Sequence, residues 1–174
     1  PYPYSPSAAE KLLTDHGWKV VPNGTTSCAR PGTAADQCGS GIPQGQTISF
    51  TIAAASTPSY VAARDISLAS AAGKLGIKIN VQTKSLDFLY NNYGHSYAPA
   101  NDDKWAAQDY GSLNLAAGYP SSNTVFNTGG SFNLGGFHDP TVDKMINAST
   151  FGADPKALSA ETTGIAKTLP ALFF

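Results

Sequence analysis

The chain has 174 residues, of which 41% are hydrophobic and only 13% are charged, and its formal net charge is −1. This length suffices for one domain with its own core, and so few charges mean that apolar burial and backbone hydrogen bonds hold the fold together. Lysines and arginines are spread thinly without a basic run, which argues against nucleic acid or an anionic membrane as a partner. No apolar run approaches the ~18–20 residues of a membrane span.

The first half of the chain predicts a helix, a long loop and a strand–helix–strand unit. The expected elements are a helix over 5–17, a loop over 22–45, a strand over 46–53, a helix over 57–75 and a strand over 77–83. Ser5 and Pro6 are typical of a helix start, and Gly17 is typical of a helix end. Alternating polar and apolar residues indicate the two strands. Strands joined in this way are parallel, with a right-handed crossover.

The loop over 22–45 contains both cysteines of the chain, Cys28 and Cys38. It is rich in Gly, Pro, Thr and Ser, so it is expected at the surface. Cysteines this close together in a loop are easily bridged, and the disulfide would stabilise the fold by roughly 2–3 kcal/mol. The alternatives are two free thiols or half of a metal site, although zinc would need further Cys or His at short spacing. A disulfide implies an oxidising, extracytoplasmic location.

The second half predicts further helices and two more strands. The expected elements are a helix over 85–91, a weaker strand over 104–110, a helical turn over 123–127, helices over 139–146 and 155–167, and a strand over 169–173. Together, residues 1–174 are expected to form one α/β domain with a mostly parallel sheet flanked by helices. Ligands of such sheets bind beyond the carboxyl ends of the strands.

One segment approaches a catalytic motif. Residues 94–98, Gly-His-Ser-Tyr-Ala, come near the G-x-S-x-G nucleophile elbow of α/β-hydrolases, with Ser96 as the nucleophile. The preceding residues read as helix rather than buried strand, Pro99 follows, and the last glycine is replaced by Ala98. A loop that happens to contain serine is the preferred interpretation, and a secreted hydrolase using Ser96 is the alternative function.

Metal and cofactor signals are weak. The histidines His16, His95 and His138 are scattered and have no second ligand three or four residues away. The Gly-Gly pairs at 129–130 and 135–136 lack the lysine and the strand–helix setting of a phosphate loop. We therefore expect no metal, no cofactor and no catalytic set.

Four segments resemble a known family, in the right order and over nearly the whole chain. Residues 4–18 are similar to the Y-x-P-x-x-A-x-x-L-L-x-x-x-G-W helix after the hinge of peptide/nickel-type solute-binding proteins (family 5). Residues 75–81 resemble that family's L-x-x-I-G-I-x-V-x-V step from helix to strand, and residues 133–146 its N-x-x-G-Y-x-(D/N)-P-x-V-D-x-L-I segment. Residues 169–173 look like its P-x-L-P-x-(L/F) strand.

The resemblance implies the C-terminal lobe of a two-lobed, extracytoplasmic solute-binding protein, with the N-terminal lobe and a final return segment missing. Such a protein would bind an oligopeptide-like or other small polar solute between its lobes, as a monomer, and deliver it to an ABC permease. It would lie in the periplasm or at the cell surface, with a lipid anchor on the full-length protein. It would bind and not catalyse.

One departure from the family concerns the ligand. Peptide-binding members hold the peptide's α-amino group with an Asp in the loop before a P-x-x-x-x-F helix. Here that loop is residues 113–120, with Ala116 near the place and no acidic residue close; Asp109 lies earlier. A free peptide N-terminus would meet no counter-charge from this lobe. That leaves room for sugars, opines, modified peptides or metal chelates.

The expected ligand contacts are aromatic and amide side chains near the strand ends. They are Tyr60, Trp105, Tyr110, Asn114 and Tyr119. Aromatic rings offer a large apolar face with a polar tip, and Asn offers both donor and acceptor. The alternative is that each aromatic ring packs in the core or on a neighbouring lobe. A third possibility is that the disulfide loop is an interaction module that docks on the permease.

Overall fold

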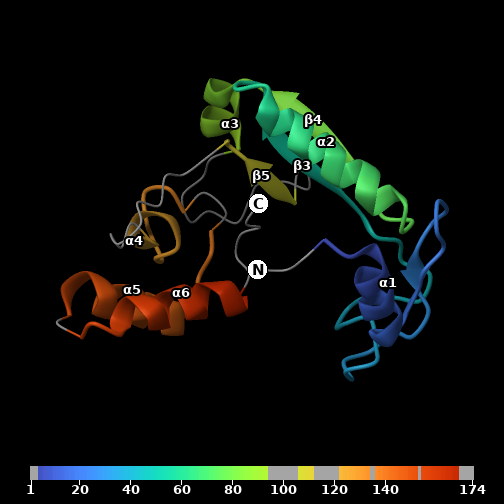
Figure 1. Cartoon of the computed structure of the whole chain (residues 1–174), viewed down its shortest axis with the longest axis horizontal. Helices are drawn as coiled ribbons and strands as arrows, with labels where there is room; N and C mark the ends of the chain where they lie inside the picture. Colours follow the sequence, from blue (N-terminus) through green and yellow to red (C-terminus); the bar gives the residue numbers. More distant parts are fainter. Residues whose placement is uncertain (1–3, 94–105, 112–121, 134–135, 153, 169–174) are drawn as a thin grey trace. The chain divides into compact units, whose positions relative to one another are not determined.

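The computed structural model describes residues 4–93, 106–111, 122–133, 136–152 and 154–168 (Figure 1). The chain divides into two compact units. The first comprises residues 1–84 and 104–111, and the second comprises residues 85–103 and 112–174. The structure is mixed α/β with a parallel sheet, which confirms the predicted fold class. That residues 1–174 act as a single lobe stays a prediction.

The first unit is built on a three-stranded parallel sheet with the order β4-β3-β5. Its strands are β3 (Ser49–Ala55), β4 (Lys78–Lys84) and β5 (Ala107–Asp109). Ala55 pairs with Lys84 and Ala54 pairs with Asp109, so the carboxyl ends of all three strands meet at one edge. The end of the central strand, residues 53–55, is fully buried. The expected parallel pairing of the first two strands is therefore confirmed.

Helix α2 (Tyr60–Gly73) packs on the sheet against β3 and β4 (Figure 1). Its buried side chains are Val61 and Asp65. The helix begins and ends two to three residues inside the predicted range, 57–75, and β3 begins three residues later than predicted. Such differences are usual at element ends, where local sequence signals are weakest. Gly76 ends the connection with a φ of +71°, which favours glycine.

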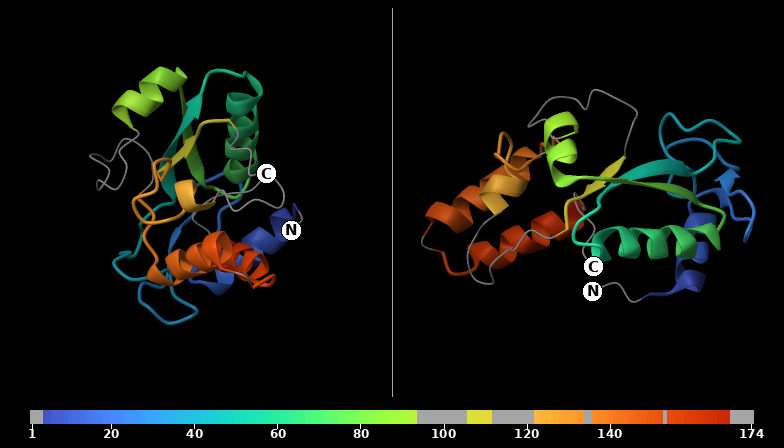
Figure 2. Two further views of the ribbon diagram at one scale, coloured as in Figure 1. Left: turned by 90° about the vertical axis from the view of Figure 1, so that its left-hand side faces the viewer. Right: turned by 90° about the horizontal axis from the view of Figure 1, so that it is seen from above.

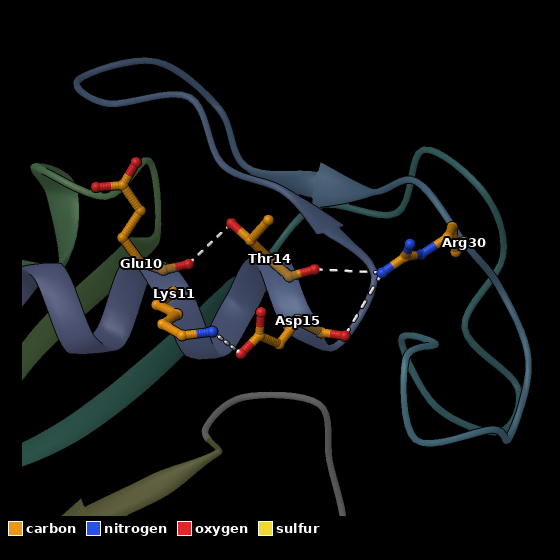
Figure 3. Close-up of polar contacts among 5 residues, drawn as sticks. All are labelled: Glu10, Lys11, Thr14, Asp15 and Arg30. Atoms are coloured by element: carbon orange, nitrogen blue, oxygen red, sulfur yellow. Dashed lines mark hydrogen bonds and ion pairs between the residues drawn. The ribbon is translucent and has the colours of Figure 1, made fainter.

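Helix α1 (Pro6–Asp15) has the predicted start, because the Ser5 Oγ accepts a hydrogen bond from the Ala8 amide at 3.3 Å. Figure 3 shows how its other end is held. The Arg30 guanidinium donates to the Thr14 carbonyl at 3.3 Å and the Asp15 carbonyl at 3.5 Å. A cation at this end also complements the helix dipole.

The predicted loop over 22–45 contains structure that its composition did not indicate. A short antiparallel pair joins β1 (Trp18–Lys19) to β2 (Ser27–Cys28). The disulfide between Cys28 and Cys38 is present, with the Cα atoms 5.9 Å apart, which confirms the predicted bridge. Cys28 is nevertheless only 2% exposed, so one half of the bridge is buried rather than on the surface.

The described residues of the second unit form four helices. They are α3 (Leu86–Asn92), α4 (Ser122–Val125), α5 (Pro140–Phe151) and α6 (Ala157–Thr168). Helices α5 and α6 lie side by side (Figure 2) and enclose a core of Phe126, Val142, Ile146 and Ile165. Asp139 caps α5 as predicted, accepting from the Thr141 amide at 2.8 Å. The helix runs five residues past its predicted end.

The predicted last strand, 169–173, lies outside the described residues. Over the described part of the chain, every helix is too short or too polar to span a membrane.

Candidate ligand-binding site

The residues expected to contact ligand lead to the edge of the sheet where the strands end. We name this set the carboxyl edge; it consists of Tyr60, Arg64, Asp65, Asp109, Tyr110 and Gly111. Tyr60, Arg64 and Asp65 lie on the first turns of α2, which follows β3, whereas the others lie at and after the end of β5. All six belong to the first unit. This is the region where ligands of open parallel sheets bind.

A two-pronged ion pair joins α2 to β5. The Arg64 Nε donates to the Asp109 Oδ2 at 2.7 Å, and its Nη2 donates to the Asp109 Oδ1. The same Nη2 donates to the Gly111 carbonyl at 2.9 Å. Such paired bonds fix the guanidinium in position as well as in charge. The hydrogen bond from Arg64 to Asp109 and the nearby negative charges raise the pKa of Arg64 despite its partial burial, so it stays cationic.

The turn after β5 is shaped to accept this pair. The Gly111 amide donates to the Asp109 Oδ1 at 2.9 Å, so the carboxylate is bonded to both the arginine and its own backbone. Gly111 has a φ of +110°, and a Cβ there would lie 3.2 Å from the Val61 Cγ2. The positive φ favours glycine, and a Cβ would press on the Val61 side chain.

Tyr60 presents an aromatic surface at this edge. Its side chain is 52% exposed, and the Arg64 guanidinium lies over its ring, 5.9 Å from the centroid. The two residues are four positions apart on one helix, where side chains are neighbours. A cation at this distance is attracted to the ring face, which biases the ring toward one orientation.

Asp65 is a carboxylic acid inside the fold. It is 1% exposed, and its Oδ2 has no hydrogen-bond partner among the described residues. Burial raises the pKa of Asp65 to about 6, with the charge of Asp109 and a hydrogen bond with that residue acting in the same direction. Arg64 opposes the shift, because a nearby cation favours the ionised form.

The structure places two of the five predicted contact residues at the carboxyl edge. Tyr60 is exposed there, and Tyr110 is partly buried directly after β5. Trp105, Asn114 and Tyr119 lie outside the described residues, as do Ser96 and His95 of the catalytic alternative.

The sequence reasoning missed Arg64 and Asp65 and did not use Asp109. A charged residue on a helix is usually a solvated one, so neither helix residue was selected. The available signal was the adjacent Arg64-Asp65 pair, the only charges between Pro58 and Gly73 in an otherwise small and apolar helix.

Two hollows of the first unit lie elsewhere. One, of about 480 Å³, is lined at the end of α1 by residues such as Thr14, Trp18 and Arg30. The other, of about 520 Å³, lies at the amino ends of β3 and β4, beside Ser49 and Lys78. Neither hollow includes a residue of the carboxyl edge. Within the described ranges, His, Cys, Asp and Glu form no group of three that could hold a metal ion.

Comparisons with known proteins find likeness in structure alone. No protein-family model matches the chain, and no curated protein matches it. Three solved structures align over more than nine tenths of its length.

The first is the oligopeptide-binding protein AppA from Bacillus subtilis in complex with a nonapeptide, with 19% identity, a TM-score of 0.62, and coverage of 95% of this chain and 29% of that one. The second is a nickel ABC transporter structure from Bacillus halodurans, with 15% identity, a TM-score of 0.66, and coverage of 96% and 32%. The third is lactococcal OppA with an endogenous peptide in the closed conformation, with 19% identity, a TM-score of 0.61, and coverage of 92% and 27%.

The chain thus spans about 30% of the length of these proteins. They share the arrangement of strands and helices with this chain at low sequence identity. The chain thus has the same α/β fold as a part of each of these proteins.

Proposed function

We propose that this chain is one lobe of the solute-binding component of an ABC importer. It would form one wall of a cleft that binds an oligopeptide-like or other small polar solute, and it would bind without catalysing a reaction. The observation that carries the proposal is the likeness of fold over more than nine tenths of the chain to three binding proteins, two of which hold peptides in their structures. The disulfide supports an extracytoplasmic location.

Within this proposal, the carboxyl edge is the solute-contacting surface of the lobe. Tyr60 offers an exposed ring for stacking on an apolar side chain or a sugar face. We propose that Tyr110, directly after β5, and also Trp105, Asn114 and Tyr119 contact the solute. Arg64 is paired with Asp109, so the edge presents little net charge to a solute.

The proposed cleft implies further partners. The second lobe would come from the same polypeptide, and the closed, solute-bound form would be recognised by an ABC permease. A lipid anchor on the full-length protein would keep it at the membrane surface. We propose that the protein acts as a monomer.

The solute class is tested by a thermal-shift screen of the full-length protein. The panel contains peptides of two to nine residues with free or acetylated N-termini, mono- and disaccharides, opines, Ni²⁺ and nickel chelates. A specific solute raises the unfolding temperature, because it binds the folded state alone. We expect one class to do so, and we expect acetylated peptides to bind no worse than free ones. A screen in which every class leaves the unfolding temperature unchanged would count against the proposal.

Tyr60→Ala tests the place of binding. For the solute found in the screen, we expect about a tenfold loss of affinity by calorimetry, since one aromatic contact is worth about 1–1.5 kcal/mol. Tyr4→Ala is the matched control, because Tyr4 is 75% exposed and lies before α1 in the same unit. Equal affinities of the two variants would place the solute elsewhere.

A further inference from the structure

The carboxyl edge combines two carboxyl groups and one guanidinium: Arg64 is bonded to Asp109, and both act electrostatically on Asp65. Asp109 uses Oδ2 for the Arg64 Nε, and its Oδ1 accepts from both the Arg64 Nη2 and the Gly111 amide. Asp65 is a buried residue of α2, next to Arg64 in the sequence, and its Oδ2 has no hydrogen-bond partner among the residues that the structure describes. The number of protons on the two carboxyl groups therefore determines the balance of charges and hydrogen bonds around Arg64.

With Asp65 protonated, the cluster holds one anion and one cation, and Arg64 is committed to Asp109. With Asp65 ionised, the buried Asp65 carboxylate and the partly buried Asp109 carboxylate repel each other, and Arg64 is attracted to both. Burial raises the pKa of Asp65 to about 6, so the change falls within an ordinary working range. The charged groups facing Asp65 are Arg64 of its own helix and Asp109 of β5. The neighbouring end of β3 contributes alanines, which carry no charge.

The position of Arg64 reaches the surface through Tyr60. The guanidinium lies over the exposed ring at 5.9 Å, while its other side is bonded to Asp109 and to the Gly111 carbonyl. A shift of the guanidinium toward Asp65 weakens its cation–π contact with the Tyr60 ring. It also weakens the hydrogen bond to the Gly111 carbonyl in the turn after β5. The buried carboxyl is thereby linked to the side chain that meets the solute.

We propose that Arg64 is a positioning residue for Tyr60, and that the two carboxyl groups of Asp65 and Asp109 beside it make solute affinity at the carboxyl edge depend on pH. The affinity is higher when Asp65 is protonated and falls as it ionises. This inference rests on the proposed function insofar as Tyr60 contacts a solute. The coupling between Asp65 and the Tyr60 ring does not depend on that function.

The coupling is tested without any solute. In full-length protein with selectively ¹³C-labelled tyrosine, the Tyr60 ring signal, assigned through Tyr60→Phe, is followed from pH 4.5 to 8. We expect a titration with a midpoint near 6, as for Asp65. Asp65→Asn, which keeps the shape and cannot ionise, should abolish it, and Arg64→Lys should weaken it because the two-pronged bond is lost. Asp15→Asn, at an exposed ion pair on α1, is the control and should leave the titration unchanged.

A wild-type Tyr60 ring signal that does not change with pH, or an unchanged midpoint in Asp65→Asn, would overturn the inference.

The pH dependence of affinity is measured with an N-acetylated, C-amidated nonapeptide of alanine and serine, which has no group that titrates in this range. We expect the wild type to bind about threefold to tenfold more tightly at pH 5 than at pH 8, and Asp65→Asn to bind equally at both. Equal wild-type affinities overturn the proposed pH dependence. If this probe does not bind at all, the result counts against a peptide as the solute, while the ring titration still decides the coupling.

Discussion

At the scale of single residues, Arg64 and Asp109 show how the helix after one strand is fixed to the end of another. The paired hydrogen bonds cross from α2 to β5, and the Gly111 amide and carbonyl both take part. The amino acids themselves are ordinary. They can form this ion pair because the sheet order brings β5 beside β3 and hence beside the start of α2.

Gly76 gives a residue-scale prediction of stability. Its φ is +71°, and a Cβ there would lie 2.6 Å from the Val21 carbonyl oxygen and 2.8 Å from the Thr26 amide nitrogen. We expect Gly76→Ala to lower the free energy of unfolding by about 2 kcal/mol or more, from backbone strain and the backbone clash together. Urea denaturation of the protein measures the change.

Gly73→Ala is the control for this prediction. Gly73 is helical, and a Cβ there would meet nothing within 4 Å. Alanine is the better helix former, so this variant should be more stable by about 0.5 kcal/mol. If the two alanine variants lose the same stability, the close approach around Gly76 does not have the cost assigned to it.

At the scale of elements, the disulfide closes a small loop that also holds the end of α1. Arg30 lies within that loop, and its guanidinium bonds the last carbonyls of the helix (Figure 3). The backbone amides of Ala29 and Arg30 both donate to the Gly17 carbonyl. The disulfide therefore holds Arg30 where it can bond the end of α1, and the bonds to the Gly17 carbonyl hold the same loop against the turn after the helix.

Replacing both cysteines by serine tests this arrangement. We expect the free energy of unfolding to fall by about 2–3 kcal/mol, the value for closing a loop of this size in the unfolded chain. Because Cys28 is buried, its serine adds a cost for an unsatisfied hydroxyl. Chemical denaturation with and without reductant separates the two, since reduction of the wild type removes the bridge alone. A stability unaffected by reductant would mean that the loop is held without the bridge.

The elements with clear local signals could be predicted from the sequence. Helices α1, α3 and α5 start where Ser5, Ser85 and Asp139 predicted them, because a side-chain cap is a local interaction. The pair β1–β2 was missed, because strands of two residues are too short to show a period. Helix α5 runs on to Phe151 because no helix breaker intervenes before Gly152.

The candidate site was predictable only in part. Tyr60 and Tyr110 could be selected because they follow predicted strands, and ligands bind where parallel strands end. Arg64 and Asp65 could not, because their partner Asp109 is more than 40 positions away in the sequence. The sheet order brings these charges together, and the strand order cannot be read from the pattern of polar and apolar residues.

At the scale of the whole molecule, the chain matches only a part of each protein that shares its fold. It covers 27–32% of the three proteins with the same fold. In the proposed function the carboxyl edge is one wall of a cleft, and one wall buries a solute from one side only. Solute sites in proteins usually bury most of the solute's surface. We therefore expect the wall described here to need a second wall.

The most direct test is calorimetric titration of the solute found in the screen into the full-length protein and into residues 1–174 alone. Circular dichroism verifies that the shorter chain is folded. We predict that the shorter chain binds at least about 100-fold more weakly, because burial from one side is lost. Equal affinity of the two samples would contradict the account, since these residues would then contain a complete site.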